Sequence, residues 1–121
     1  MTNEPRRYRN ISHAVTTTAF ASQDVYICPA NTTAIIKEII VTNIDGTNNA
    51  DITLALHDDS ASSAQTKAFV STKQVNADDF LRLDSANIYL EASDKIQAQA
   101  HSANGDLNLF LFIEEYYDPS R

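Results

Sequence analysis

Apolar and polar residues alternate with a period of two along most of the chain. Leucine and isoleucine occupy every second position of residues 50–58, and residues 95–101 repeat the pattern with smaller apolar side chains. Residues 33–43 are rich in β-branched isoleucine and valine, which favour strands over helices. Because a period of two places successive side chains on opposite faces, these segments predict β-strands with one face buried in a core.

The predicted strand at residues 106–115 is apolar on both of its faces. One face carries leucine and isoleucine at alternate positions from Leu107 to Ile113, and the other carries Phe110 and Phe112. A strand that packs against a single core needs only one apolar face. We therefore expect Phe110 and Phe112 to contact something other than the main core of the domain.

Five weaker alternating patterns complete the series, at residues 14–20, 24–28, 67–72, 80–83 and 88–91. Polar turns separate these segments, and the two glycines fall in residues 45–49 and 103–106, which predict hairpin connections. Eight or nine short strands at regular spacing are typical of sandwiches and barrels. The sequence therefore predicts an all-β protein, an antiparallel β-sandwich of the jelly-roll kind.

A length of 121 residues fits one domain that spans residues 1–121. We interpret residues 1–12 as an N-terminal arm and residues 115–121 as a C-terminal tail. The tail contains adjacent tyrosines, Tyr116 and Tyr117, a residue type enriched at protein interfaces. These tyrosines would either insert into a groove of a neighbouring chain or fold back over their own sandwich.

Charge is distributed unevenly along the chain. The net charge is −7, yet residues 1–9 carry +2, because Arg6, Arg7 and Arg9 outnumber Glu4. An acidic body argues against nucleic-acid binding, since phosphate contacts require cations. The basic arm would dock on an acidic neighbour or on another copy of the chain, with a solvated, frayed tail as the alternative.

Candidate catalytic and metal-binding residues are few and poorly arranged. The three histidines, His13, His57 and His101, fall on different predicted strands with no spacing that forces a shared metal site. No G-x-S-x-G elbow or glycine-rich phosphate loop is present. We therefore expect no enzyme activity, no catalytic residue, no cofactor and no metal.

Three pairs of adjacent acids and one cysteine also receive structural interpretations. In a strand, consecutive side chains point to opposite faces, so we expect solvated roles for the pairs Asp58-Asp59, Asp78-Asp79 and Glu114-Glu115. Cys28 follows an apolar segment and is expected to be a small buried hydrophobe rather than a reactive thiol. The chain has no apolar run long enough to span a membrane, and its charged opening does not read as a secretory signal.

Several segments together carry a family resemblance. The run from Val25 to Asn43 reads Val-Tyr-Ile-Cys-Pro-Ala-Asn-Thr-Thr-Ala-Ile-Ile-Lys-Glu-Ile-Ile-Val-Thr-Asn. With residues 79–83, residues 88–97 and the final strand ending in Glu114-Glu115, it resembles small β-sandwich virion proteins of tailed bacteriophages. The resemblance covers most of residues 23–115 and consists of structural motifs, and the family has Gly where this chain has Ser93.

This resemblance implies a virion structural protein, assembled in the host cytoplasm, that decorates or cements a capsid. A component of the neck, tail or fibre is the alternative within the same class. The implied partners are further copies of the chain and other virion proteins, with no membrane. We predict partner contacts at Arg6, Arg7, Arg9, Phe110, Phe112, Tyr116 and Tyr117. A third hypothesis is a carbohydrate- or receptor-binding module that uses residues 58–63 with Tyr89 or the tail tyrosines.

Overall fold

The computed structural model describes residues 6–16, 18, 24–59, 65–84, 86–100 and 106–119. These residues form nine strands: β1 (Arg6–Val15), β2 (Asp24–Ile27), β3 (Thr32–Asn43), β4 (Ala50–Asp58), β5 (Gln65–Val75), β6 (Phe80–Leu83), β7 (Ile88–Leu90), β8 (Lys95–Ala100) and β9 (Leu107–Tyr117). No helix in the described part of the chain is long and apolar enough to cross a membrane.

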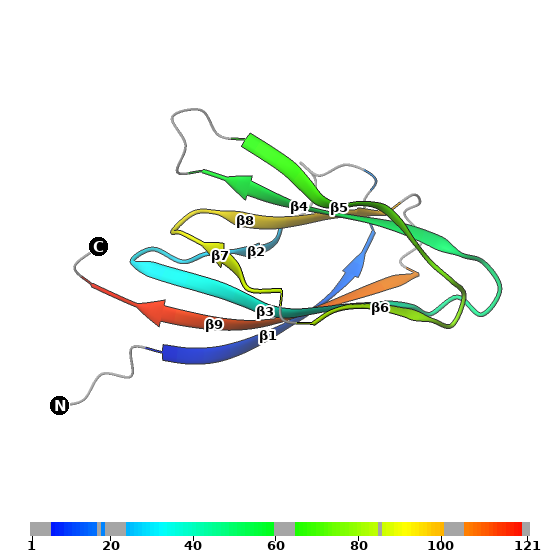
Figure 1. The fold of residues 1–121 in the computed structure, drawn as a ribbon, viewed down its shortest axis with the longest axis horizontal. Helices are drawn as coiled ribbons and strands as arrows, with labels where there is room; N and C mark the ends of the chain where they lie inside the picture. The colour runs from blue at the N-terminus through cyan, green and yellow to red at the C-terminus, as the bar shows by residue number, and fades with distance from the viewer. Residues whose placement is uncertain are drawn as a thin grey trace.

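The strands form two antiparallel sheets that face each other (Figure 1). The first sheet has the order β1-β9-β3-β6, with β7 also paired to β3, and the second has the order β2-β8-β4-β5. β6 pairs with residues 39–42 of β3 and β7 with residues 34–36, so together they act as one interrupted strand. The predicted fold class is confirmed, since this is a jelly-roll sandwich.

The connections between strands differ from the predicted hairpins. Residues 45–49 join β3 to β4, which belong to different sheets, so this segment is a crossover. The buried Asn43 side chain donates hydrogen bonds to the carbonyls of Asn48 and Val75, at 2.9 and 3.0 Å. The Asp45 carboxylate accepts the backbone N–H groups of Thr47 and Asn48, which lowers its pKa. Of the other predicted hairpin, residues 103–106, only residue 106 is among the described residues. The strands on either side of it, β8 and β9, also belong to different sheets.

The core lies between the sheets and is built from the alternating apolar residues of each strand. Its largest fully buried side chains are Ile36, Ile39, Ile52, Leu54, Leu90, Ile96, Leu107, Leu109 and Leu111. These residues come from both sheets and match the apolar positions read from the period of two. The alternation therefore marks which side of each strand faces the opposite sheet.

Strand β1 corrects the predicted N-terminal arm. Residues 1–12 were expected to be an arm, but from Arg6 onward they form a strand that pairs with β9 over its whole length. The strand predicted at residues 14–20 overlaps β1 only at its first two residues. The pattern fails here because Arg7 and Arg9 occupy positions where an inward-facing strand normally has apolar residues. The predicted tail is also shorter, since β9 continues to Tyr117.

The turn between β7 and β8 forms with Ser93 at the position where the virion proteins that the sequence resembles have glycine. Ser93 adopts a left-handed conformation, with φ of 77°, and its N–H donates to the Cys28 carbonyl at 2.9 Å. The Asp94 carboxylate accepts the N–H groups of Glu91 and Asp59, each at 2.9 Å. These hydrogen bonds hold Ser93 in a backbone region that disfavours side chains.

Replacing Ser93 with glycine is expected to raise the free energy of unfolding by about 0.5 kcal/mol. Relief of left-handed strain exceeds the entropy that glycine adds to the unfolded chain. The matched control is Ala92→Gly in the same turn, where φ is not positive, and this change should be destabilising. Urea denaturation of both variants measures the effect, and equal destabilisation by both would contradict it.

Candidate functional site

Pairing of β1 with β9 brings the predicted partner-binding residues onto two adjacent strands. In this register Arg6 lies opposite Tyr116, Asn10 opposite Phe112, and Ser12 opposite Phe110. Because side chains alternate, the seven residues divide between two faces of the sheet. Arg6, Phe110, Phe112 and Tyr116 lie on the face away from the core. Arg7, Arg9 and Tyr117 share the alternation of the buried Glu115.

Phe110 and Phe112 belong to a wider apolar surface on the outer side of the first sheet, which we call the aromatic face. It comprises Tyr8, Ile40, Phe80, Phe110 and Phe112. Ile40 lies directly opposite Phe110 across the β3–β9 pair. Phe80 lies on β6 opposite Thr42, which is the next residue after Ile40 on the same side of β3. The side chains of Tyr8 and Phe112 are 69% and 37% exposed. The second apolar side predicted for residues 106–115 therefore faces solvent.

Charged side chains border the aromatic face. Arg82 donates a hydrogen bond to Glu38, which holds the pKa of that guanidinium above its usual value. Lys37 lies 3.9 Å from Glu114, and the Tyr116 hydroxyl donates to Glu114 at 2.6 Å. An apolar centre with a polar border is the usual anatomy of a protein interface.

A shallow hollow of about 420 Å³ opens beside the aromatic face, where Tyr8, Asn10, Lys37, Phe112 and Glu114 line it together with Arg9 and Ile113. It lies where the register of β3 against β9 shifts between Ile36 and Glu38. A bulge of this kind displaces one residue from the regular ladder and bends the strand. The bulge therefore shapes the surface around Phe112.

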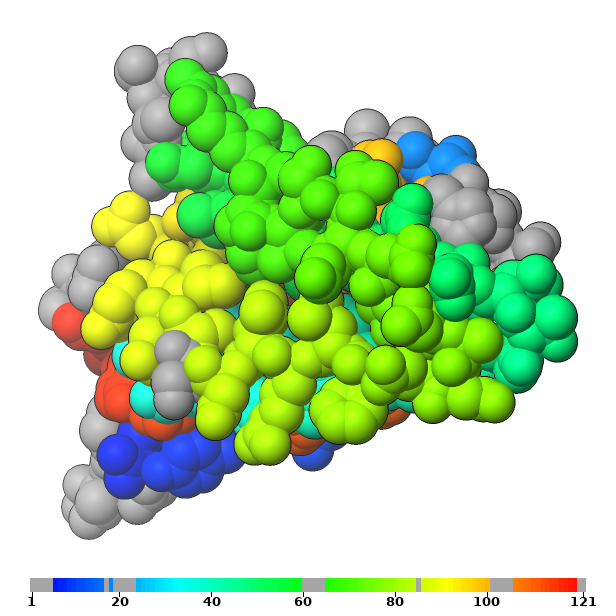
Figure 2. Space-filling model, turned by 45° about the vertical axis from the view of Figure 1, so that its right-hand side comes forward, coloured from blue at the N-terminus to red at the C-terminus, as the bar shows by residue number. Residues whose placement is uncertain are grey.

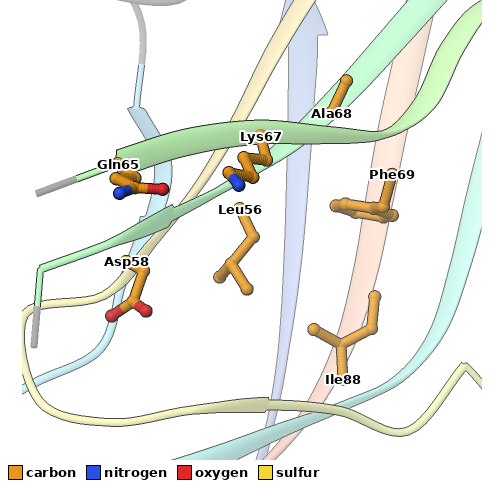
Figure 3. Close-up of a pocket in the computed structure, with 7 residues that line it drawn as sticks. All are labelled: Leu56, Asp58, Gln65, Lys67, Ala68, Phe69 and Ile88. Atoms are coloured by element: carbon orange, nitrogen blue, oxygen red, sulfur yellow. The ribbon is translucent and has the colours of Figure 1, made fainter. Parts of the chain in front are cut away.

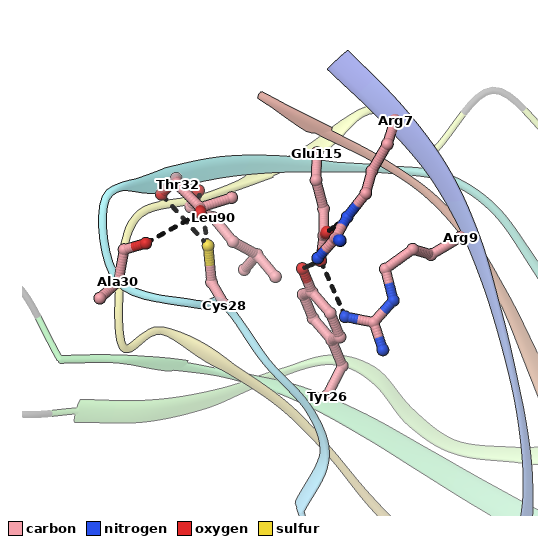
Figure 4. Close-up of polar contacts among 8 residues, drawn as sticks. All are labelled: Arg7, Arg9, Tyr26, Cys28, Ala30, Thr32, Leu90 and Glu115. Carbon is pink, nitrogen blue, oxygen red and sulfur yellow. Dashed lines mark hydrogen bonds and ion pairs between the residues drawn. The ribbon is translucent and has the colours of Figure 1, made fainter. Parts of the chain in front are cut away.

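Arg7 and Arg9, on the side of β1 that faces the second sheet, bind a buried carboxylate (Figure 4). Glu115 is 2% exposed and accepts hydrogen bonds from Arg7 Nε at 2.7 Å and Arg9 Nη1 at 3.1 Å. The hydroxyl of the buried Tyr26, on the opposite sheet, also donates to Glu115. This cluster ties β1, β9 and β2 together, so Arg7 and Arg9 have an internal structural role.

Glu115 also corrects the expectation that adjacent acids are solvated. Burial alone would raise the pKa of this carboxyl, but the hydrogen bond from Tyr26 and the two arginines outweigh burial and lower it. Burial and the same carboxylate raise the pKa of Tyr26, so its hydroxyl stays protonated. Glu114, on the other face of β9, is partly exposed. The two members of the pair therefore have different environments.

Cys28 is buried at the start of the turn between β2 and β3, as the sequence predicts (Figure 4). Its Sγ donates a weak hydrogen bond to the Thr32 carbonyl at 3.4 Å. Burial, with the carboxylates of Glu115 and Asp94 nearby, raises the pKa of the thiol to about 11. The residue is therefore a packed, protonated thiol.

The histidines do not assemble into a metal site in the part of the chain that is described. Among those residues, no three His, Cys, Asp or Glu side chains gather closely enough to hold a metal ion. His57 Nδ1 lies 2.6 Å from the Thr66 hydroxyl, and Nε2 lies 3.7 Å from Asp59. His101 lies outside the described residues.

Of the residues named for carbohydrate binding, Tyr89 and Tyr116 lie on the outer face of the first sheet, because Tyr89 and Glu114 are both opposite Ile35 and Tyr116 follows the alternation of Glu114. Tyr89 is exposed on β7, where it lies opposite Ile35 of β3, and Tyr116 is bound to Glu114 on β9. Residues 60–63 lie outside the described part of the chain. Tyr117 lies on the other side of β9, the same side as Glu115.

Three members of the aromatic face, Tyr8, Ile40 and Phe80, were not predicted as partner-binding residues. Each is an apolar or aromatic residue on the outward side of its strand, so the alternation contained part of the signal. The missing information was the order of strands in the sheet, which places β1, β9, β3 and β6 side by side.

Together the fold and this surface define a jelly-roll sandwich with an exposed aromatic sheet face. No protein-family model matches the chain, and no curated protein matches it. Among solved structures, the chain is similar to a pilus subunit of Bacillus endospore appendages, at 14% identity and a TM-score of 0.48, over 93% of this chain and 87% of that one.

Two viral structures are also similar to the chain. The first is the VP2 subviral particle of infectious bursal disease virus, at 11% identity and a TM-score of 0.47, over 94% of this chain and 33% of that one. The second is a pentameric capsid protein from metagenomic phage sequences, at 15% identity and a TM-score of 0.40, over 93% of this chain and 65% of that one. The chain thus spans about a third of the VP2 chain. Shared folds do not by themselves assign function.

Proposed function

We propose that this chain is a non-enzymatic structural subunit of a virus particle, specifically a decoration or cement subunit of a tailed-phage capsid. It would bind neighbouring virion proteins, including further copies of itself, through the aromatic face. The observation that carries the proposal is the exposure of Phe112 and Tyr8 around the Phe110–Ile40 pair. The sequence resemblance over residues 23–115 supplies the virion setting.

The aromatic face has the composition of a contact surface. Aromatic residues are enriched in interfaces, and isolated soluble proteins rarely expose large contiguous apolar patches. The ion pairs Arg82–Glu38 and Lys37–Glu114 at its border would orient a partner more than they would add affinity. Arg6 lies at the same border, where its guanidinium is 5.5 Å from the ring centre of Tyr8 and interacts with Tyr116.

The proposal predicts that Phe112→Ser reduces incorporation of the protein into particles about tenfold or more, because it removes a central apolar contact. The matched control is Phe69→Ser, since Phe69 is 38% exposed but lies on β5 of the second sheet. Quantitative mass spectrometry of purified particles measures incorporation, and circular dichroism checks that both variants fold. Equal incorporation, or equal loss, of the two variants would contradict the assignment of the aromatic face.

The same measurement separates the capsid from the neck, tail or fibre. A copy number that matches the capsid lattice supports the decoration role. A copy number that matches the single tail vertex would move the protein to the neck or tail while leaving its structural class unchanged. Absence of the protein from purified particles would overturn the proposal.

A further inference from the structure

A second surface feature lies at the edge of the sandwich where the two sheets part (Figure 1). The end of the β4–β5 hairpin diverges from β7, and the two sheets are open along this edge (Figure 1). In the space-filling view the β4–β5 end stands apart from the segment that contains β7 (Figure 2). A pocket of about 450 Å³ lies between them, lined by Leu56, Asp58, Gln65, Lys67, Ala68, Phe69 and Ile88.

The lining residues are positioned by the pairing of β4 with β5. Leu56 lies opposite Lys67, and Asp58 lies opposite Gln65, so all four side chains share one face of the hairpin. The register shifts between Leu54 and Ala55, which places Phe69 in an irregular stretch of β5. Ile88 comes from β7 of the other sheet and closes the pocket from that side (Figure 3).

The pocket has an apolar part and a polar part. Leu56 and Ile88 pack against the hydrophobic core, and Phe69 lies beside them with 38% of its side chain exposed. Lys67 and Gln65 continue along β5 toward the end of the hairpin (Figure 3). Apolar walls with a few convergent polar groups, at a volume of several hundred Å³, are typical of small-molecule sites.

Lys67 supplies the charge that selects a ligand. It takes part in none of the ion pairs found among the described residues. Asp58, nearer the hairpin end, is engaged in an interaction of its own. The ammonium of Lys67 is therefore the group with capacity for an incoming anion, next to the wall formed by Leu56.

From this geometry we propose that the pocket binds an amphipathic molecule with one anionic head, in particular a free medium-chain carboxylate. Its hydrocarbon chain would lie between Leu56, Phe69 and Ile88. Its carboxylate would accept hydrogen bonds from the Lys67 ammonium and the Gln65 amide. The negative charge of Asp58 beside them favours a single charge on the head over a double one.

A competing explanation is that Lys67 only protects an edge strand. β5 is at the edge of its sheet, and charged residues that point inward on edge strands prevent unwanted strand pairing. That role needs a charge but no ligand, so binding measurements distinguish the two explanations.

The test titrates the full chain with decanoate, decanol and decyltrimethylammonium, and follows binding by calorimetry and by NMR chemical shifts. Decanoate is expected to bind more tightly than decanol, and the cation is expected to bind least. Lys67→Met, which keeps a flexible unbranched side chain but removes the ammonium, should weaken decanoate binding about tenfold and leave decanol binding unchanged. Lys73→Met is the matched control, since Lys73 is on the same strand outside the pocket and should leave both unchanged.

Shifts confined to the residues that line the pocket, with the expected order of ligands, support the proposal. It is overturned if decanoate does not bind, if the cation binds more tightly than decanoate, or if Lys73→Met weakens decanoate as much as Lys67→Met. Binding that Lys67→Met leaves intact but Phe69→Ser abolishes would also overturn it, because the site would then select only for apolar surface.

Discussion

Replacing Glu115 with alanine is expected to lower the free energy of unfolding by about 2–3 kcal/mol. The change leaves the buried hydroxyl of Tyr26 without its acceptor and removes the bond between β9 and the two arginines of β1. The value lies below that of a fully buried ion pair because the Arg7 side chain is 66% exposed and is screened by solvent. Urea denaturation at neutral pH measures the change.

The neighbouring residue provides the control. Glu114→Ala alters the same strand on its outer face and is expected to cost less than about 1 kcal/mol, because Glu114 is partly exposed. If the two variants lost equal free energy of unfolding, burial of the Glu115 carboxylate would not determine how much this residue contributes to stability.

The same carboxylate makes stability depend on pH. Its pKa in the folded protein lies below the ordinary value of 4.5, so the folded state favours the ionised form. The resulting stability is present above the unfolded pKa and is lost as the pH falls through the folded pKa. Glu115→Gln should therefore reduce the loss of stability on acidification below pH 4.5, and an unchanged acid limb would contradict this reading.

Modification of Cys28 by a thiol reagent at pH 8 is expected to be at least about a hundredfold slower in the folded protein than in urea. The thiolate is the reacting form, and a pKa of about 11 leaves little of it at that pH, whereas the unfolded thiol titrates near its ordinary value. Burial of Sγ adds a steric barrier. The rate at which a chromogenic disulfide reagent releases its coloured thiolate measures the reaction of Cys28 in the folded protein and in urea.

A displaced thiol serves as the control for Cys28. The double variant Cys28→Ser with Ala30→Cys moves the sulfur to an exposed position of the same turn, so its rate should approach that of the unfolded chain. Fast modification of the unaltered folded protein would contradict the burial and pKa of Cys28.

Most of the sandwich can be predicted from the sequence because alternation is a local property. The strands β3, β4, β8 and β9 were each expected within two residues of their observed bounds. Their apolar sides face the core as predicted. Strand order depends on contacts between distant residues, so no local pattern could show that residues 45–49 cross between sheets.

The errors at β1 and Glu115 have one physical origin. Arg7 and Arg9 look like a solvated arm until their partner is known, and that partner lies more than 100 positions later. Similarly, the sequence indicated that Phe110 and Phe112 have a role outside the core, but Tyr8 and Phe80 joined them only through sheet order. The pocket beside Lys67 depends on a register shift between β4 and β5 and left no signal in the residue pattern.

The composition of β5 restricts the geometry of any assembly. If two copies paired antiparallel through this edge about Val70, Lys67 of each would lie opposite Lys73 of the other, and like charges in that position are destabilising. The left-handed Thr72 also interrupts the regular backbone that such pairing requires. A continuous sheet running from subunit to subunit through β5 is therefore disfavoured.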